Sequence, residues 1–506
     1  MLDFHETFSV LAFALEALQL LILSWLLYNV TTVIYNIYFH PLARFPGPRL
    51  AAASEWWQAY VEVIKEESLS KKLLDLHAKY GDVVRIAPNE LHFSKPSAYH
   101  EIYNVKNRWD RDMKLYRGLA DEESLITIPN YARAKKRRDL TAALFSRKNV
   151  IDMQHIVQNC LEDTCANIDA HIAAAQPVDV SAAVRCCTLD VICTLCFART
   201  VHAARAPRFA APAVRALHAA SPFLLVFKHF PLVHALTQRV PPALLVRLVP
   251  EMRGLVQVRE MLQQEVRAAK AAPQRLQVAQ QPTVYHALLA AEHALSDTAL
   301  CDEGALFINA GTDTTGDALA LCAVNVLSRA DVHAKLLAEL VEVWPTLEEP
   351  SPRFERLEKL VYLTAVLKES LRLAHGIVQP MTRVVPAEGA VISGQYIPGG
   401  TVVAMSNVFV HWNEELFPDA HAFRPERWLA RGADLEPWLV AFSKGPRSCL
   451  GINLAWAELY MTVATLFRRY DMKLNGVGPE DIVWRDTFIP HHVGPDLTVI
   501  AKRRAK

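Results

Sequence analysis

Residues 442–451, which read Phe-Ser-Lys-Gly-Pro-Arg-Ser-Cys-Leu-Gly, constrain the fold of this chain more than any other segment. They form the pattern F-x-x-G-x-R-x-C-x-G, and a run with helical periodicity begins directly after it. Gly445 and Gly451 permit tight turns that let backbone amides approach the Cys449 sulfur. The helix that follows adds the positive end of its dipole. A lone cysteine is usually an inert buried thiol, but this setting makes Cys449 a candidate ligand.

The segment matches the haem-binding signature of the cytochrome P-450 superfamily at every fixed position, and the chain resembles this family over residues 40–506. The resemblance implies haem b as the cofactor, with Cys449 as the thiolate that binds the iron. A thiolate ligand donates electron density and favours O–O cleavage. The resemblance also implies that Arg447 pairs with a haem propionate and that Phe442 shields the sulfur from water.

Two further segments match the family in chain order. Glu369 and Arg372 form its E-x-x-R pair, and their spacing places both side chains on one helical face. Arg427, within Phe-Arg-Pro-Glu-Arg-Trp at 423–428, completes the family's Glu-Arg-Arg cluster, whose implied role is folding and haem retention. Arg383, in Arg-Val-Val-Pro at 383–386, is a candidate second propionate partner.

Residues 310–315, Ala-Gly-Thr-Asp-Thr-Thr, lie midway along a predicted helix at 298–328. Threonines there can simply donate to carbonyls one turn earlier and bend the helix. In the family this is the oxygen-activation motif of the helix that crosses the distal haem face. The resemblance therefore implies that Thr314 orients water or oxygen by hydrogen bonding and that Asp313 supplies protons.

A basic run at 133–138 departs from the family pattern. Aligning Phe145-Ser146 with the family places Arg138 at the propionate-binding position, with Arg137 as a rival, while the usual aromatic position falls on Ala134. Alone, the run could be a nuclear localisation signal or a solvated helix face. In the family this helix lies on the proximal face, so we expect it to dock an NADPH-dependent cytochrome reductase.

Periodicity predicts a mainly α protein with small β-sheets set to one side. Helices are expected at 68–80, 134–147, 150–174, 182–198, 298–328, 331–345, 358–373 and 452–470, and strands at 83–86, 90–93, 401–405 and near the C-terminus. Prolines at 207, 212, 222, 231, 241, 242 and 250 predict only short helices between 200 and 280, and residues 221–236 resemble the family's membrane-dipping access region. Cys193 and Cys196 lie in an apolar run, which indicates core packing.

The N-terminus predicts a membrane anchor. Residues 8–28 are apolar except for Glu16 and Gln19, which is long enough to span a bilayer. The first basic residue is Arg44, so we expect the catalytic body to face the cytoplasm. The predicted organisation is an anchor at 1–38, a Pro-rich hinge at 39–50 and a catalytic domain at 51–506. Asn29 begins a glycosylation acceptor at the expected cytoplasmic edge and should be unused.

The whole sequence therefore predicts a haem-thiolate monooxygenase of the endoplasmic reticulum membrane, in a single-pass orientation. Its expected partners are the reductase, the lipid bilayer, O2 and a small apolar substrate, such as a terpenoid or other secondary metabolite of the kind that similar fungal proteins oxidise. An alternative is a haem-thiolate isomerase or ligand-binding protein without oxygen insertion. With 54 Lys and Arg against 53 Asp and Glu, the chain lacks the basic excess typical of a nucleic-acid binder, so we expect none as partner.

Overall fold

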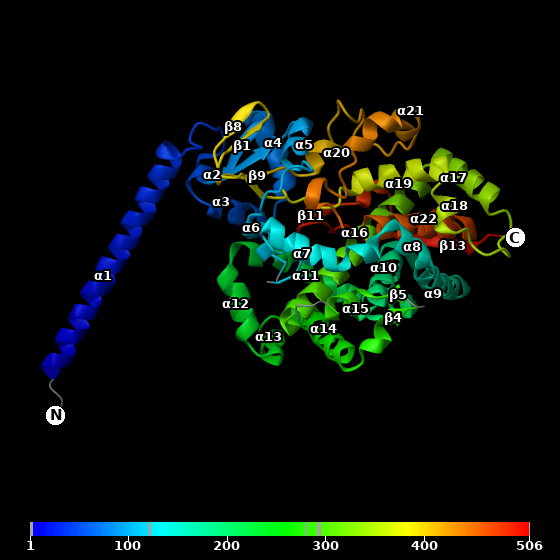
Figure 1. Ribbon diagram of the computed structural model, residues 1–506, viewed down its shortest axis with the longest axis horizontal. Coiled ribbons are helices and arrows are strands. Elements are labelled where there is room, and N and C mark those ends of the chain that lie inside the picture. The colour runs from blue at the N-terminus through cyan, green and yellow to red at the C-terminus, as the bar shows by residue number, and fades with distance from the viewer. Residues whose placement is uncertain (1–3, 120–122, 279–280, 291–294, 505–506) are drawn as a thin grey trace.

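We describe a computed structural model that covers residues 4–119, 123–278, 281–290 and 295–504. Helices dominate, and a small sheet region lies at the end of the body from which the N-terminal helix emerges (Figure 1). The longer helices are α1 (Phe4–Ile34), α4 (Leu69–Tyr80), α7 (Tyr131–Thr141), α9 (Gln154–Ala173), α10 (Val180–Phe197), α11 (Pro212–His229), α14 (Arg253–Ala271), α16 (Asp297–Leu327), α17 (Ala330–Val343), α19 (Val361–Ala374), α21 (Glu426–Leu435) and α22 (Ile452–Arg469).

Shorter helices complete the connections. They are α2 (Arg49–Ala53), α3 (Trp56–Ala59), α5 (Pro96–Ile102), α6 (Met113–Arg117), α8 (Arg147–Asp152), α12 (Pro231–Arg239), α13 (Pro242–Leu248), α15 (Val284–Leu289), α18 (Phe354–Leu357) and α20 (Val408–His411), with π-helical turns η1 (Tyr35–Phe39) and η2 (Tyr60–Ile64). Side chains cap several starts: Ser296 accepts from the Ala299 amide before α16, at 2.9 Å, and Asp179 accepts from the Ala182 amide before α10, at 3.0 Å.

The largest sheet has the order β1-β2-β9-β6 and contains β1 (Val83–Ala87), β2 (Glu90–Phe93), β9 (Val402–Ala404) and β6 (Arg383–Val384). The β1–β2 and β9–β6 pairs are antiparallel, whereas β2 and β9 are parallel, with Leu91 opposite Val403. A second sheet joins β10 (Tyr470–Leu474), β13 (Thr498–Arg503) and β3 (Val178–Asp179). Two-stranded pairs are formed by β4 (Gln277–Val278) with β5 (Gln281–Pro282), β7 (Ala390–Ile392) with β8 (Gln395–Ile397), and β11 (Trp484–Asp486) with β12 (Pro490–His492).

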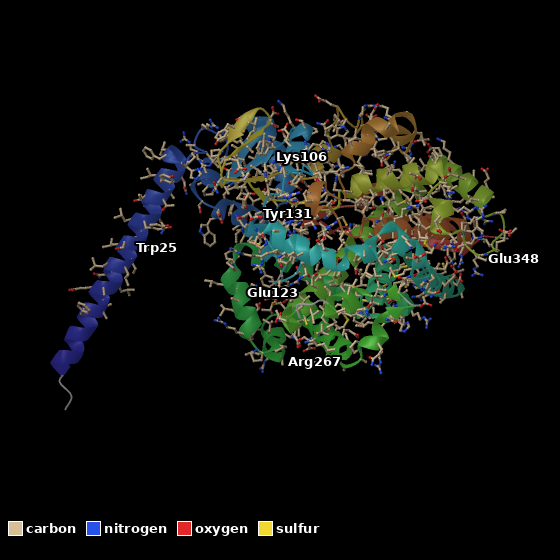
Figure 2. The ribbon with its side chains drawn as sticks, viewed as in Figure 1. Trp25, Lys106, Glu123, Tyr131, Arg267 and Glu348 are labelled. Atoms are coloured by element: carbon tan, nitrogen blue, oxygen red, sulfur yellow. The ribbon has the colours of Figure 1, made fainter. Side chains whose placement is uncertain are left out.

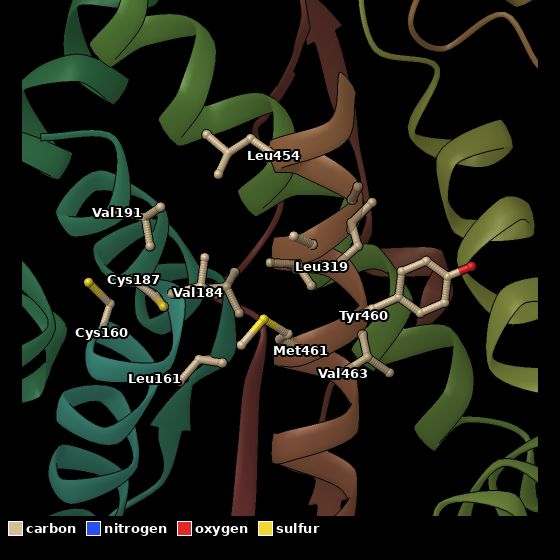
Figure 3. Packing of buried hydrophobic residues seen from close by; sticks show 14 of the residues in the cluster. Cys160, Leu161, Val184, Cys187, Val191, Leu319, Leu454, Tyr460, Met461 and Val463 are labelled. Carbon is tan, nitrogen blue, oxygen red and sulfur yellow. The ribbon is translucent and has the colours of Figure 1, made fainter. Parts of the chain in front are cut away.

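The main core lies where α9, α10, α16 and α22 pack together. Figure 3 shows Leu161 of α9, Val184 of α10, Leu319 of α16 and Met461 of α22 meeting in this region, and all four are buried. The expected core roles of Cys193 and Cys196 are confirmed, since both are buried free thiols. Within the described residues, no group of three His, Cys, Asp or Glu side chains is arranged to hold a metal ion.

The mainly α fold class is confirmed, and most expected helices match closely. The predicted helix at 150–174 is divided at Met153 into α8 and α9. The expectation of only short helices between 200 and 280 is wrong. Pro222 lies inside the 18-residue α11, and the 19-residue α14 fits between the last proline-initiated turns. Several prolines there occupy first helical turns, where the missing N–H costs nothing.

Among the described residues, the helix Phe13–Phe39 is long and apolar enough to span a membrane, and its apolar window is not buried in the body. Figure 2 shows the Trp25 side chain projecting from α1 well away from the rest of the protein. Asn29 lies within this helix, and its amide donates to the Trp25 carbonyl at 2.7 Å. Two other helices, Val180–Phe197 and Pro207–His229, are also long and apolar enough, but Val180–Phe197 is largely buried in the body.

Candidate functional site

A cavity of about 600 Å³ lies between α7, α11, α14 and α16 on one side and the loop before α22 on the other. The predicted site residues that line it are Asp313, Thr314, Phe442, Arg447, Cys449 and Arg138. Arg383 is not among the described residues that line this cavity. It is buried behind the wall, where its guanidinium donates to the Thr382 carbonyl at 2.8 Å and stacks on the Tyr103 ring.

The loop before α22 presents the Cys449 side chain to the cavity. The Cys449 amide donates to the Phe442 carbonyl at 2.9 Å, which closes the loop around the intervening residues. Gly445 has a φ of +75°, and a Cβ there would approach the Tyr103 carbonyl oxygen to 2.6 Å, so glycine is required. Gly451 lies in a turn directly before α22 and has a φ of −85°, so this turn does not require the left-handed conformation.

The electrostatic surroundings of the Cys449 thiol act in opposite directions. Burial raises its pKa, whereas the backbone amide of Gly451 and the charge of Arg138 lower it. The Gly451 amide therefore approaches the sulfur as expected, although no positive φ is needed. Phe442 lies beside Trp456 of α22, with ring centroids 6.1 Å apart, and forms part of the cavity wall near the cysteine.

Cationic side chains gather at one edge of the cavity and have no ion pair with an acidic side chain among the described residues. Arg447 donates to the Pro129 carbonyl at 2.8 Å through Nη2, but its Nε and Nη1 are buried and make no hydrogen bond. The Nε of Arg111 and the hydroxyl of Tyr116 are likewise buried and unpartnered. Burial, with the nearby charges of Arg111 and Arg383, lowers the pKa of Arg447 to about 9. Such a cluster needs an anion to satisfy it.

Sequence reasoning missed Arg111 and Tyr116. The Arg111 guanidinium lies 4.5 Å from the Tyr116 ring centroid, and burial lowers the pKa of Arg111 to about 10. Both residues precede α7 in a segment that matched no motif. A signal that could have found them is the charge pattern Trp-Asp-Arg-Asp at 109–112, but its meaning depends on the fold that brings it beside Arg447.

Arg137 and Arg138, the two candidates for the propionate-binding position, point to different partners. Arg138 lines the cavity and donates to the Ser448 carbonyl at 2.8 Å, next to Cys449. Arg137 instead binds the buried Glu303 carboxylate of α16 at 2.9 Å. Ala134 also lines the cavity, so no aromatic donor stands at that position.

Asp313 and Thr314 lie on α16, whose middle passes along the cavity. The Thr314 hydroxyl donates to the Ala310 carbonyl at 2.6 Å, which is the helix back-bonding that the sequence left open. Asp313 is buried, and its carboxylate lies 3.3 Å from the Arg185 guanidinium. Burial raises the pKa of Asp313, while Arg185 opposes that shift.

The Glu369, Arg372 and Arg427 side chains form one buried cluster. Glu369 accepts from Arg372 Nη2 at 2.8 Å and from Arg427 Nε at 3.0 Å. Trp428, which the sequence did not single out, adds an indole N–H donor to the same carboxylate at 2.9 Å. Arg372 also donates to the His411 carbonyl at 2.8 Å, so the cluster ties α19 to the end of α20 and, through Arg427, to α21.

These residues fit haem b. A thiol exposed to the cavity can bind the iron, and the unpartnered Arg447, Arg111 and Tyr116 donors suit the two carboxylates of the macrocycle. The fit rests on orphaned buried donors that no acidic side chain among the described residues satisfies.

Comparison with known proteins agrees with this geometry. The family model described as cytochrome P-450 matches residues 48–497. The chain is 34% identical to the cytochrome P-450 monooxygenase flvC of Aspergillus flavus, over 96% of both chains. It is 33% identical to the cytochrome P-450 monooxygenase macH of Penicillium terrestre, over 95% of this chain and 96% of that protein. It is 32% identical to the N-acetyltryptophan 6-hydroxylase ivoC of Emericella nidulans, over 94% of this chain and 95% of that protein.

Proposed function

Because the chain belongs to the cytochrome P-450 family, whose members are oxidoreductases that use haem b, we propose that it inserts one oxygen atom from O2 into a small apolar substrate of secondary metabolism. The observation that carries the proposal is the position of Cys449 and of the Asp313–Thr314 pair on the wall of one cavity. Ligand binding or isomerisation needs a thiolate but has no need of an acid and a hydroxyl beside it.

Haem, when bound, supplies the oxygen-activating chemistry of a thiolate-ligated iron. The protein contributes position and electrostatics. Arg447, Arg111 and Arg138 would hold the propionates, and Arg383 would contribute its charge from behind the cavity wall. The Gly451 amide lowers the pKa of Cys449 against the effect of burial and so favours the thiolate.

Two side chains of α16 manage protons in this proposal. Asp313 is a buried acid whose pKa is raised by burial, so it can hold a proton and release it into the cavity. The Thr314 hydroxyl donates to the Ala310 carbonyl, which leaves its oxygen lone pairs available to orient a water. Such positioning favours productive use of O2 over release of peroxide.

The proposed substrate is a terpenoid or another apolar secondary metabolite. The cavity is lined mostly by apolar side chains, including Leu125, Ile126, Leu217, Leu224, Val258, Leu262, Ile377, Met381, Phe488 and Ile489. A wall of this kind binds by burial of apolar surface. One relative is named for hydroxylation of N-acetyltryptophan, so aromatic substrates belong among the compounds to test.

Electrons are proposed to come from NADPH through a cytochrome reductase that docks on α7. Arg133, Lys135 and Lys136 of this helix are exposed, and an acidic partner surface would complement them. The apolar helix Phe13–Phe39 is proposed to anchor the protein in the endoplasmic reticulum membrane, with the body in the cytoplasm because basic residues begin only at Arg44.

The test is expression in yeast with a reductase, followed by spectroscopy and product analysis. The wild-type protein should show the red-shifted Soret band of a thiolate-ligated haem when reduced with CO, and should form an oxygenated product that depends on NADPH. Cys449→Ala should lose the band and the product, and Cys449→Ser should retain haem weakly at most. Cys301→Ala, which changes another cysteine of the cavity wall, should keep the band.

Two outcomes would contradict the proposal. A thiolate-type CO spectrum in Cys449→Ala would mean that another residue binds the iron. Conversion of substrate without consumption of NADPH would favour the isomerase alternative.

A further inference from the structure

Arg185 of α10 lies between two carboxylates of α16. Its Nε is 3.3 Å from Asp313, its Nη2 binds Asp317, and its Nη1 donates to the Ser181 hydroxyl. Arg185 and Asp313 are buried, and Asp317 is nearly so. One guanidinium therefore serves two acids that are neighbours on the same helix face.

The position of Arg185 is built into the α10–α16 contact. A Cβ on Gly316 would lie 2.7 Å from the Arg185 Cγ, so the absence of a side chain at 316 makes room for the arginine stem between Asp313 and Asp317. The Thr188 hydroxyl, one turn further along α10, donates to the Thr312 carbonyl at 2.9 Å and fixes the two helices in register. Arg185 is thus lodged at the point where both carboxylates are within reach.

The two carboxylates border different cavities. Asp313 lines the large cavity that also contains Cys449 and Thr314. Asp317 and Arg185 line a second cavity of about 40 Å³, together with Ser181, Trp484 and His492. The rest of its lining is apolar and includes Leu321 and Ile482. Its volume has room for one water molecule, whose volume in the liquid is about 30 Å³, held by the polar groups of Asp317 and Arg185. The Arg185 site therefore connects the wall of one cavity with the wall of the other.

The charge balance of the site favours a bound proton. Two buried carboxylates and one guanidinium carry an excess negative charge if both acids are ionised. Burial raises the pKa of Asp317 to about 7, with Asp313 adding to the rise and Arg185 opposing it. Because the two acids interact, this proton belongs to the pair.

The other titratable groups near Arg185 come from four elements. They are Asp179 at the start of α10, His218 of α11, His491 and His492 of β12 and, beside the histidines, Arg485 of β11. His218 and His491 stack with centroids 4.0 Å apart, and burial lowers their pKa values to about 4 and about 3, so both are neutral near pH 7. Burial raises the pKa of Asp179. The positive charge of Arg485 is paired with the Glu66 carboxylate at 2.7 Å.

We propose that Asp317 and Arg185 form a proton-supply route that enters from the second cavity and recharges Asp313 after each proton transfer into the large cavity. Water in the second cavity protonates Asp317. Side chains four residues apart on a helix have Cβ atoms about 5–6 Å apart, so one water can bridge the two carboxyls. The proton then moves to Asp313 while Arg185 strengthens its bond to the ionised Asp317. Asp317 and Arg185 are positioning residues, and the inference rests on the proposed oxygenase function.

The decisive variant is Asp317→Asn, which keeps the shape of the side chain but cannot carry a proton. Arg185 would then pair with Asp313 alone and hold it ionised. We expect the ratio of product to NADPH to fall by about tenfold and the yield of peroxide to rise. This fall is smaller than the one expected from losing a direct general acid. The double variant Asp313→Asn/Asp317→Asn should be no worse than Asp313→Asn alone. Haem content and the CO spectrum should be unchanged.

A readout independent of turnover is the infrared carboxylic-acid C=O band of the resting haem-loaded protein, titrated through neutral pH. The difference spectrum of wild type minus Asp317→Asn should contain a band that disappears as pH rises. The matched control is Glu303→Gln, because Glu303 is also a buried acid of α16 whose pKa burial raises to about 7, yet its partner is Arg137. This control should leave coupling unchanged.

The outcomes separate the two proposals. If the wild type forms no NADPH-dependent product, the oxygenase function is wrong, while the infrared titration still tests the shared proton. If the wild type is active and Asp317→Asn matches Glu303→Gln in coupling, the route through Asp317 is overturned. A difference spectrum of wild type minus Asp317→Asn that contains no titrating band would also overturn it.

Discussion

At the scale of single residues, the Thr314 hydroxyl has one hydrogen-bond partner already. It donates to the Ala310 carbonyl, so what it offers to the cavity is an acceptor that can hold a water in place. Helix back-bonding and a role in proton delivery are therefore compatible, because the two use different sides of one oxygen atom.

This geometry predicts the effects of two substitutions at Thr314. Thr314→Val keeps the β-branched shape but has no hydroxyl, so folding and haem binding should be nearly unchanged while product per NADPH falls and peroxide rises. Thr314→Ser retains the hydroxyl and should preserve coupling. The measurement is the ratio of product to NADPH on a substrate without a hydroxyl group, since a substrate hydroxyl could replace the missing one. Equal coupling in the two variants would show that the hydroxyl has no part in proton delivery.

Arg111 carries a second prediction at this scale. Its buried Nε has no partner among the described residues, so haem carboxylates should be what satisfies it. Arg111→Leu should speed the loss of haem to an acceptor such as apomyoglobin by about tenfold, which corresponds to the loss of about 1.4 kcal/mol from one charged hydrogen bond. Arg108→Leu, a nearby arginine that does not line the cavity, is the control. Haem loss at the wild-type rate from Arg111→Leu would remove Arg111 from the cofactor site.

Some residues of the site could be predicted from local sequence patterns, and others depend on contacts with distant segments. Cys449, Arg447, Glu369 and Arg372 could be predicted because their spacing along the chain already implies what they do. Trp428, Arg111, Tyr116 and Asp317 could not, since each acquires its role from a partner in a distant segment. Asp317 lies only four residues beyond Asp313, but its importance depends on Arg185, which no local pattern connects to it.

At the scale of elements, the end of α11 is fastened to the N-terminal part of the body. Lys228 binds the buried Glu62 carboxylate of η2 at 2.8 Å and donates to Gln379 at 2.9 Å. His229 also binds Glu62, and the Gln379 amide donates to the Glu62 carboxylate at 2.6 Å. Burial alone would raise the pKa of Glu62, but these partners lower it to about 2. The same C-terminal half of α11 lines the large cavity through Ser221, Leu224 and Phe227, so this cluster positions part of the cavity wall.

Lys228→Met should therefore destabilise the protein by about 3–5 kcal/mol, because it leaves a buried carboxylate unpaired. Lys270→Met, which breaks an exposed pair with Asp297, should cost about 0–1 kcal/mol. Chemical denaturation of the haem-loaded proteins measures both. The double variant Glu62→Gln/Lys228→Met should recover much of the loss, and failure to do so would place the cost in packing of the lysine stem.

The same cluster gives a pH dependence with a defined sign. A carboxyl whose pKa is depressed in the folded state stabilises the protein above its ordinary pKa of about 4.3. The stabilisation from ionised Glu62 is lost as the pH falls from about 4.3 toward 2. The unfolding free energy of the wild type should thus fall more steeply on acidification than that of Glu62→Gln. Parallel plots of unfolding free energy against pH would contradict the role of the Glu62–Lys228 pair.

Element prediction succeeded where periodicity was long and failed where proline dominated. The long helix expected at 298–328 is α16, and the one expected at 452–470 is α22, because apolar spacing persists over many turns. Between 200 and 280 the prolines were interpreted as breaks. Most of them begin helices, and Pro222 is accommodated within α11 by its tertiary packing.

At the scale of the whole molecule, α1 and the body are in direct contact. The helix continues as η1, where Asn36 is buried; its amide donates to the Ala53 carbonyl at 3.1 Å, and its carbonyl accepts from Arg85 at 2.8 Å. Leu42 and Phe45, within the predicted hinge, are buried in the core beside β1 and β2. On the same side of the body, α12 and α13 expose Leu232, Leu236 and Leu248 (Figure 1).

Two truncations separate the membrane-anchoring role of α1 from the contribution of residues 35–38 to the stability of the body. Removing residues 1–34 should release most of the protein from membranes and leave haem binding and stability nearly intact. Removing residues 1–38 should release it equally, but should lower the unfolding free energy by about 1–3 kcal/mol because the buried Arg85 loses the Asn36 carbonyl. Membrane sedimentation, the CO spectrum and denaturant midpoints are the measurements. Loss of haem from the protein lacking only residues 1–34 would show that the body depends on the anchor.

The Asn36–Arg85 contact also limits how the protein can turn. A body tied to its anchor by a loose tether samples every orientation above the bilayer, and most of those keep a given face away from a neighbour in the same membrane. A body held at a fixed angle to its anchor rotates mainly about one axis, the membrane normal. The exposed basic side chains of α7 then stay at a constant height, and each lateral encounter with a second anchored protein becomes a search over a single angle.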